Sequence, residues 1–260
     1  MKKILSAVCA VMIGAMMLTG CGGPEPNSVH KLADLEGKKI GVQLGTVGMM
    51  FAEDTKDATV EKYNKGADAV QALKQGKVDA VIIDSEPAKV FVEKNDDLKI
   101  LDEKFEPEEY AIAIKKGNTE LTTKINDALK ALKENGTLDS IKANWIGEDK
   151  GKNPYKTPDG TTYPNGTLTM ATNAEFPPYE LKEGGKVVGF DVDMMQAVCD
   201  HLGYELKITD MAFDSIIAAV NSGKADVGVA GMTVTEDRLK NVDFSDSYTT
   251  AEQVVIVRKK

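Results

Sequence analysis

The sequence is poor in the residues on which metal centres and disulfide frameworks depend. Its 260 residues include only three cysteines and two histidines. His201 follows Cys199 by two positions, a spacing that does not place both side chains on one face of a helix. The sequence also contains no nucleophile elbow and no glycine-rich phosphate loop. We therefore expect no metal, no cofactor and no catalytic residue.

Basic residues are fewer than acidic ones. The formal net charge at pH 7 is −9, from 32 basic and 41 acidic residues. An acidic chain with scattered lysines is a poor candidate for binding nucleic acid or an anionic membrane surface. Hydrophobic residues make up 42% and charged residues 28% of the chain, which is typical of a soluble globular protein.

The N-terminus carries the longest apolar run. Two lysines precede residues 4–18, which are apolar but too few for a comfortable membrane span, as in a secretory signal. The run ends in LTGC (residues 18–21), which resembles the lipobox of bacterial lipoproteins. The resemblance implies cleavage before Cys21 and attachment to the membrane through lipid on its thiol; the alternative is an ordinary secretory signal with a chance cysteine. Cys9 would leave with the signal, so Cys199 would have no disulfide partner and is expected to be a small buried hydrophobe.

From residue 31 onward, strand-like and helix-like segments alternate, which predicts an α/β fold with largely parallel sheets. Residues 147–166 are rich in Gly, Pro, Asp and Asn without periodicity, and they form the one good linker. After it the alternation restarts. We expect a helix capped by Asp191 or Asp193 that runs to His201, and a strand over residues 225–230.

A weak internal repeat relates the two sides of this linker. Residues 71–86 (QALKQGKVDAVIIDSE) and 218–233 (AAVNSGKADVGVAGMT) share a helix, Gly-Lys, one residue, Asp and an apolar strand. Superimposing them places Asp84 on Gly231, each at the carboxyl end of a strand, where open α/β sheets bind ligands. Asp84 could instead cap the helix that follows it.

Arginine is as scarce as histidine, with Arg238 and Arg258 as the only two. Arg238 lies in the first turn of a short helix expected to begin at Thr233 or Thr235, where a cation opposes the helix dipole. Its planar fork matches a carboxylate in a bidentate fashion, which lysine cannot do. With the N–H groups of Met232 and Thr233, it would form a carboxylate-binding corner. The alternative is a surface arginine paired with one of the two acidic residues just before it.

The repeat suggests two similar lobes that face each other across a cleft. Asp84 would then lie on one side and Arg238 on the other. A carboxylate and a guanidinium across a cleft are complementary to a zwitterion, which is the backbone of a free amino acid.

Several longer motifs point to one family. Those after the linker resemble the first lobe of the family 3 solute-binding proteins: ATNAEFPPYE (171–180), GFDVDMM (189–195), GKADVGVAGMTVTEDR (223–238) and DFSDSY (243–248). Those before it resemble the second lobe and the tail that returns to the first: GKKIGVQLGTVG (37–48), GKVDAVIIDSEPA (76–88) and YAIAIKKGNTEL (110–121). These proteins are the amino-acid receptors of ABC importers, and the resemblance implies their two-lobed type II periplasmic-binding-protein fold.

The order of these motifs is reversed relative to the family, which indicates a circular permutation. Residues 147–166 would join the ancestral termini, which permutation tolerates when those termini lie close together. We expect residues 254–257 to cross the hinge and pair in the sheet that contains residues 40–44. The predicted parts are a signal peptide (1–20), a lipid-anchored tether (21–30), lobe 2 (31–107), the returning tail (108–146), the linker (147–166), lobe 1 (167–250) and a hinge-crossing strand (251–260).

The resemblance also implies how a ligand's α-carboxylate is held. Arg238 would clamp the carboxylate, helped by Thr233. Backbone N–H groups around Thr46, Val47 and Gly48 would add to the clamp. Val47 stands where some relatives carry a hydroxyl residue, which matters little if the backbone N–H is what binds.

The rest of the ligand is assigned in the same way. Asp84 would bind the α-ammonium, and Gly231 would offer its carbonyl. Phe176 and Phe213 match the aromatic residues that sandwich the ligand's side chain, although each could equally be a core residue. Asn173 stands where several relatives carry an aspartate, which leaves the identity of the ligand open.

The resemblance implies a monomeric receptor, lipid-anchored on the extracytoplasmic face of the cell membrane. It would bind a free polar or cationic L-amino acid and deliver it to the membrane subunits of an ABC permease. One rival is a dehydratase-like enzyme on the same scaffold, for which Glu175 and Asp214 are the only candidate acids or bases. The other is an amino-acid sensor without a transport role.

Overall fold

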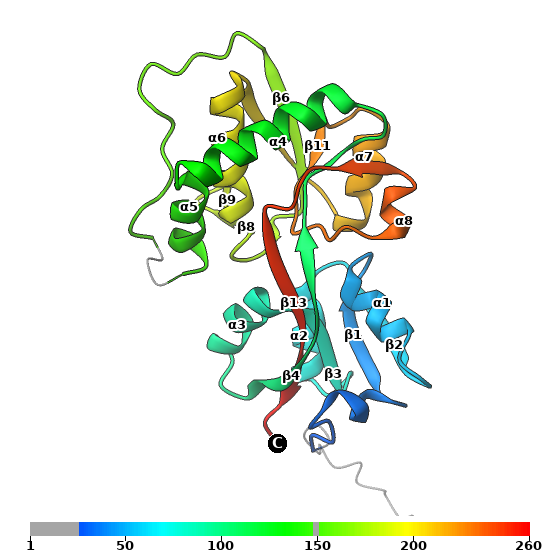
Figure 1. The fold of residues 1–260 in the computed structure, drawn as a ribbon. Helices are drawn as coiled ribbons and strands as arrows, with labels where there is room; N and C mark the ends of the chain where they lie inside the picture. The colour runs from blue at the N-terminus through cyan, green and yellow to red at the C-terminus, as the bar shows by residue number, and fades with distance from the viewer. Residues whose placement is uncertain (1–25, 148–150) are drawn as a thin grey trace, which may run out of the picture.

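The structure, a computed structural model, describes residues 26–147 and 151–260. Two five-stranded sheets with their helices form the upper and lower halves of Figure 1, and two long strands run side by side between them. Cys21, the predicted site of lipidation, lies outside the described residues, as does the predicted signal peptide.

The first sheet has the strand order β2-β1-β3-β13-β4. Strand β1 pairs in parallel with β2 and β3, whereas β13 pairs antiparallel with β3 and β4. The pairing of Val254 with Ile83 in β3 confirms that the end of the chain completes the sheet formed by its beginning. The strands are β1 (Lys39–Gln43), β2 (Thr59–Tyr63), β3 (Ala80–Asp84), β4 (Leu98–Tyr110) and β13 (Thr249–Arg258).

The second sheet has the order β10-β6-β11-β5-β12. Its parallel strands come from after the predicted linker, and β5, which comes from before it, pairs antiparallel with β11 and β12. The strands are β5 (Ala113–Lys115), β6 (Thr167–Thr172), β10 (Glu205–Asp210), β11 (Val227–Gly228) and β12 (Val242–Phe244). A small antiparallel sheet adjoins it, formed by β7 (Glu175–Phe176), β8 (Glu180–Glu183) and β9 (Lys186–Val188).

Helices pack against both sheets, and their apolar faces supply much of the core. Helices α4 and α5 precede the predicted linker but pack against α6, which comes after it (Figure 1). Around the first sheet lie η1 (Leu32–Leu35), α1 (Val47–Glu53), α2 (Gly66–Lys74) and α3 (Ser85–Glu93). Around the second lie α4 (Thr119–Glu134), α5 (Thr137–Trp145), α6 (Phe190–Leu202), η2 (Phe213–Ser215), α7 (Ile216–Asn221) and α8 (Glu236–Leu239).

The start of α6 corrects one prediction. Neither Asp191 nor Asp193 caps the helix; both lie in its first turn, and the N-cap is Gly189. Gly189 has a φ of 142°, and a Cβ there would lie 2.0 Å from the carbonyl oxygen of Tyr179. Only glycine fits this turn, so the helix begins at Phe190, two residues before the start that a cap at Asp191 would give, and the side chain of Asp191 is buried.

The strand predicted over residues 225–230 is also shorter than expected. Only Val227–Gly228 pair on both sides as β11, with β6 and β5. The chain then turns at Gly231, whose φ is 53°. Of the two caps considered for the short helix after this turn, the structure selects Thr235, whose side chain accepts the N–H of Arg238 at 3.2 Å.

Candidate ligand-binding site

A narrow cavity lies between the two sheets, at the carboxyl ends of their parallel strands. Nine of the eleven predicted ligand-binding residues line it. Whether these residues bind a ligand stays a prediction. The lining residues are Gln43, Thr46, Val47, Asp84, Asn173, Phe176, Phe213, Ala230, Gly231, Thr233, Arg238 and Gln253.

Two predicted residues lie outside this lining. Met232 is 1% exposed and packs in an apolar cluster of the second sheet, with its carbonyl accepting the N–H of Ala111. Gly48 lies in the first turn of α1, where a Cβ would come within 2.9 Å of the carbonyl oxygen of Ile82. Gly48 therefore allows α1 to pack closely on β3, next to the cavity.

Arg238 is a buried cation, 6% exposed, at the second sheet's side of the cavity. Its guanidinium donates to the carbonyl of Thr233 at 2.7 Å and to the carbonyl of Gly45, across the cavity, at 3.0 Å. The guanidinium carbon also lies 5.4 Å from the centre of the Phe213 ring, a cation–π contact. Two backbone carbonyls and the Phe213 ring thus hold the guanidinium group in place.

No carboxylate within the described residues forms an ion pair with Arg238. The alternative of a surface arginine paired with Glu236 or Asp237 is wrong, because Arg238 is buried and Asp237 pairs with Lys240. Burial lowers the pKa of Arg238, while the charges of Glu108 and Asp84 raise it. An arginine stays protonated in proteins, so this side of the cavity presents a positive charge without a paired anion.

Asp84 supplies the opposite charge from the first sheet. It is the last residue of β3 and occupies the N-cap position of α3, but its side chain makes no capping hydrogen bond. Asp84 is thus the N-cap residue by position, as one of the alternatives had it, but its side chain does not cap the helix. Its carboxylate instead accepts the hydroxyl of Tyr110. Burial and then the nearby charge of Glu108 raise the pKa of Asp84 to about 7, against the opposing hydrogen bonds from Tyr110 and Gln253.

A second carboxylate, which the sequence did not reveal, lies beside this group. Glu108, near the end of β4, accepts the hydroxyl of Thr233 and the side-chain amide of Gln253, both at 2.6 Å. These bonds connect the two strands that run between the sheets with the loop after β11. Gln253 could have been found, because a polar side chain within the apolar run of β13 has to face a partner. Glu108 lies in an acidic segment that is typical of a solvated surface, so no signal marked it.

The far end of the cavity is walled by amides and aromatic rings. Gln43, another residue that was missed, ends β1 and donates across the cavity to the side-chain oxygen of Asn173 at 2.9 Å. Asn173 in turn donates to the carbonyl of Met211 at 2.8 Å. Phe176 is 7% exposed and stacks on Tyr179, with ring centres 5.5 Å apart. This end therefore offers hydrogen bonds and apolar contact without a free charge.

The turn before α1 adds a set of backbone donors. Thr46 caps the helix by accepting the N–H of Met49 at 3.3 Å. The first N–H groups of a helix have no partner within it, so Val47 and Gly48 carry N–H groups of this kind beside the lining residue Thr46.

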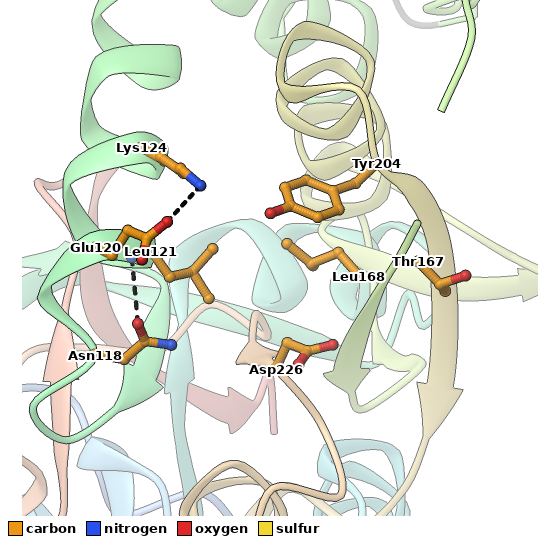
Figure 2. Close-up of a pocket in the computed structure, with 8 residues that line it drawn as sticks. All are labelled: Asn118, Glu120, Leu121, Lys124, Thr167, Leu168, Tyr204 and Asp226. Carbon is orange, nitrogen blue, oxygen red and sulfur yellow. Dashed lines mark hydrogen bonds and ion pairs between the residues drawn. The ribbon is translucent and has the colours of Figure 1, made fainter. Parts of the chain in front are cut away.

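A second hollow lies at the opposite ends of β6 and β10, beside the start of α4 (Figure 2). Its charged groups already have partners: Glu120 pairs with Lys124 at 2.7 Å, and Asp226 accepts the N–H of Thr169 at 2.7 Å. Lys124, the cation among the lining residues of this hollow, is thus already ion-paired, whereas Arg238 in the cavity between the sheets has no such pair in the described residues.

Two other kinds of feature were sought in the part of the chain that the structure describes. Residues 26–147 and 151–260 hold no cluster of three or more His, Cys, Asp or Glu side chains arranged to bind a metal ion. In the same residues, no helix has both the length and the apolar character needed to span a bilayer.

Two sheets with their helices face one cavity and present opposite charges to it, which is a two-lobed α/β arrangement. The chain belongs to the bacterial extracellular solute-binding proteins, family 3, whose sequence profile matches residues 32–148 and 168–260. The resemblance seen in the sequence motifs is thereby confirmed at the level of the family.

Individual relatives match over shorter stretches. The arginine-binding extracellular protein ArtP of Bacillus subtilis (strain 168) is 45% identical over 92 residues, 35% of this chain and 36% of that protein. The L-cystine-binding protein TcyJ of Escherichia coli (strain K12) is 35% identical over 121 residues, 46% of each chain. A probable histidine-binding protein of Neisseria gonorrhoeae is 41% identical over 97 residues, 37% of this chain and 36% of the other. The chain thus spans about a third to a half of the length of these relatives.

Among solved structures, an ancestral arginine-binding protein bound to arginine is 52% identical and covers 31% of this chain and 36% of its own, with a TM-score of 0.30. The arginine-bound form of domain 1 from TmArgBP is 42% identical and covers 36% of this chain and 82% of its own, with a TM-score of 0.32.

Proposed function

We propose that this protein is an extracytoplasmic receptor that binds one free, polar L-amino acid between its two lobes and delivers it to an ABC importer. The observation that carries the proposal is the pair of opposite charges on the cavity. Arg238 comes from the second sheet, Asp84 comes from the first, and neither has an ion-pair partner among the described residues. A zwitterion would neutralise both, and the burial of the two side chains would strengthen each contact.

Each end of the ligand has a set of groups that fits it. The α-carboxylate would lie between the fork of Arg238, the hydroxyl of Thr233 and the N–H groups at the start of α1. The α-ammonium would donate to Asp84 and to the carbonyl of Gly231. These roles follow the charges and the donors on the cavity wall.

The ligand's side chain would extend between Phe176 and Phe213 towards the amides of Gln43 and Asn173. Amide groups both donate and accept hydrogen bonds, so a polar side chain fits this end. The curated relatives bind arginine, histidine or cystine by their names, which keeps both cationic and uncharged polar amino acids as candidates.

The domain arrangement forms part of the same proposal. We infer that the chain is a circular permutation of the family, with residues 147–166 joining the ancestral termini. Two observations support this inference: β13 and β5 each complete the sheet made by the other half of the chain, and the family match is interrupted at residues 149–167. Lipidation at Cys21 and docking on a permease remain part of the proposal on sequence grounds alone.

The first test is a thermal-shift screen of the chain from residue 22 onward against the common L-amino acids and cystine. A ligand at a hundred times its dissociation constant adds about 2.7 kcal/mol of stability, which raises the melting temperature by several degrees. Stabilisation by one or a few amino acids, lost in Arg238→Ala, is the expected result. Lys240→Ala is the matched control, because Lys240 is an exposed cation beside the same helix and pairs with Asp237 outside the cavity.

Two outcomes would support a rival. If no amino acid stabilises the protein, the receptor proposal fails. If the stabilising amino acid is converted on incubation, as followed by mass spectrometry, the dehydratase-like enzyme is favoured, and Glu175→Gln and Asp214→Asn identify its acid or base. A sensor would bind its amino acid equally well but would not stimulate the ATPase of a permease encoded beside it.

A further inference from the structure

Two carboxyl groups with no role in the proposed ligand contacts lie directly behind the cavity wall. Glu180, the first residue of β8, and Asp191, in the first turn of α6, are both 0% exposed. Both side-chain oxygens of Glu180, and Oδ1 of Asp191, have no hydrogen-bond donor within the described part of the chain. A buried polar group without a partner is costly, so the arrangement requires an explanation.

The other oxygen of Asp191 is fully used. Oδ2 accepts the backbone N–H of Gly231 at 2.8 Å and the hydroxyl of Tyr248 at 3.0 Å. Gly231 lines the cavity. Tyr248 directly precedes β13, which crosses from the second half of the molecule into the first sheet. One carboxylate therefore fixes both a wall of the cavity and the start of a crossing strand.

The surroundings of the two carboxyls oppose a second negative charge. The groups that act most strongly on Glu180 are Asp191 on α6, Asp84 at the end of β3 and Asp210 at the end of β10, all of them acidic. The phenols of Tyr179 and Tyr248 are further titratable neighbours, and neither carries a positive charge. Two carboxylates that share a site cannot both be ionised cheaply, so the pair keeps a proton.

The proton belongs on Glu180. Burial, and then the charge of Asp191, raise the pKa of Glu180 well above its usual range. Burial also raises the pKa of Asp191, but only to about 6, because the N–H of Gly231, a proton on Glu180 and the hydroxyl of Tyr248 oppose the effect of burial. A protonated Glu180 supplies a donor to Asp191, which accounts for atoms that otherwise lack a partner.

We propose that Glu180 and Asp191 form a buried acid pair that holds one proton at neutral pH and positions the binding site. Protonated Glu180 orients Asp191, and Asp191 holds the N–H of Gly231 and the hydroxyl of Tyr248. Gly231 has a φ of 53°, and a Cβ there would lie 2.7 Å from the ring of Phe176. Through the N–H of Gly231, Asp191 fixes the peptide group between Ala230 and Gly231, two residues that line the cavity, so the pair holds this part of the cavity wall in place. Glu180 and Asp191 are positioning residues and do not touch the ligand.

A matched pair of substitutions separates the role of the proton from the role of side-chain volume. Glu180→Gln keeps a hydrogen-bond donor for Asp191, whereas Glu180→Met has similar length and no donor. We expect Glu180→Gln to retain the affinity of the full chain at about pH 7. Glu180→Met should weaken it by roughly tenfold or more, since it leaves a buried charge without its hydrogen bond. Isothermal titration calorimetry of the full-length protein with L-arginine and L-glutamine as probes measures both. Equal affinities in the two variants would overturn the proposal.

The pH profile supplies a second readout. The folded state holds a proton on Glu180 that the unfolded state loses near the ordinary pKa of glutamate, so the wild-type melting temperature should fall steadily as the pH rises above that range. Affinity should fall only at alkaline pH, where the folded pair loses its proton and two charges lie side by side. Glu180→Gln has no proton to lose there and should keep both. A wild type and a Glu180→Gln variant with the same alkaline profile would contradict the proposal.

Infrared spectroscopy tests the proton without any ligand. At about pH 8, above the ordinary range of carboxyl pKa values and above the pKa of Asp84, the ligand-free protein should show one protonated carboxyl band that is absent from Glu180→Gln. Lack of the band in the wild type would exclude the shared proton.

The acid pair depends on the proposed function only for the affinity measurement. If neither probe binds the wild type, the receptor proposal is in question while the infrared band and the melting temperatures still decide for or against the acid pair.

Discussion

The two sheets of this protein have the same construction and present opposite charges to the cavity between them. The strand orders of the two sheets, β2-β1-β3-β13-β4 and β10-β6-β11-β5-β12, correspond position by position when each is written from one edge to the other. In both, three parallel strands are followed by two that alternate in direction, and the fourth strand comes from the other half of the chain. The internal repeat in the sequence falls on the matching third strands, β3 and β11.

The sheets differ in the chain just after these third strands. Strand β3 continues directly into α3, so its last residue, Asp84, ends at the cavity with its carboxylate. Strand β11 leads into a turn at Gly231 and a loop to α8, which places Arg238 over the cavity. A shared topology therefore brings two strand ends together, and the length and conformation of the segment after each strand decide which charge it contributes.

The largest effect is expected from removing the positive side of this comparison. Arg238→Ala leaves a bound carboxylate without its buried partner, which costs about 2–5 kcal/mol, or at least a roughly thirtyfold loss of affinity. Calorimetric titration with the amino acid identified in the screen measures the change. Arg238→Lys should recover only part of the loss, because an ammonium cannot form the bidentate contact.

The other arginine is the matched control. Arg258 is also buried, but it donates to the carbonyls of Leu73 and Val78 at the end of α2, both at 2.8 Å, and does not line the cavity. Arg258→Ala should lower the melting temperature and leave the affinity unchanged. If Arg258→Ala weakened binding as much as Arg238→Ala, the loss would reflect general instability and not the cavity charge.

Asp84, the negative group on the cavity, should make ligand binding depend on pH. Burial raises the pKa of Asp84 from 3.8 to about 7, so below about pH 7 the ligand-free protein holds a proton that the ligand's ammonium must displace. Affinity should therefore rise by about tenfold per pH unit up to about pH 7, roughly a hundredfold from pH 5, and then level off. Asp84→Asn should bind more weakly at neutral pH and show no such slope.

The same shift has the opposite sign for the ligand-free protein. Between about pH 4 and pH 7 the folded state binds more protons at Asp84 than the unfolded state does, so this group's contribution to stability falls as the pH rises. Affinity and ligand-free stability should thus change in opposite directions over this range. Parallel changes would show that another group controls the pH dependence.

A smaller effect is expected from the turn that makes the second sheet different. In Gly231→Ala the new Cβ would lie 2.7 Å from the ring of Phe176 and 3.0 Å from that of Tyr110, on a residue with a φ of 53°. Gly223→Ala is the control, because Gly223 has a φ of 74° and no atom within 4 Å of its Cβ position. Both substitutions carry a conformational cost of about 1–2 kcal/mol, and only Gly231→Ala adds overpacking of about 1–3 kcal/mol. Urea unfolding and titration of both variants isolate the second contribution, and equal losses would show that crowding is unimportant.

Several features that the two sheets share or differ in could be predicted from the sequence, because local residues determine them. The apolar run that forms β3 ends at Asp84 as expected, since a buried parallel strand needs continuous apolar residues. The crossing of β13 into the first sheet followed from the reversed order of the motifs. The position of Arg238 followed from the scarcity of arginine and its unfavourable place in a short helix.

The features that were missed depend on contacts between distant segments. Strand β2 is half-exposed and polar, so its sequence has no apolar alternation to mark it. Glu108 became part of the site through its bonds to Thr233 and Gln253, which lie more than a hundred residues away in the chain. Asp191 was assigned as a cap because the tight turn at Gly189 has no signature beyond a single glycine.

The smallest effect is expected from an ion pair that joins the two halves of the molecule. Lys65, the residue before α2, and Glu175 of β7 form an ion pair of 2.7 Å from one half of the molecule to the other. Because such exposed pairs contribute little, Lys65→Ala should weaken ligand binding by less than about fivefold, and high salt should remove the difference. Lys182→Ala is the control, since Lys182 pairs with Asp210 at 2.6 Å within the second half and its loss should leave affinity unchanged. A larger loss for Lys65→Ala that persists in high salt would mean that this ion pair holds the two halves of the molecule together. The two sheets would then contribute to ligand binding through a contact outside the cavity as well as through Asp84 and Arg238.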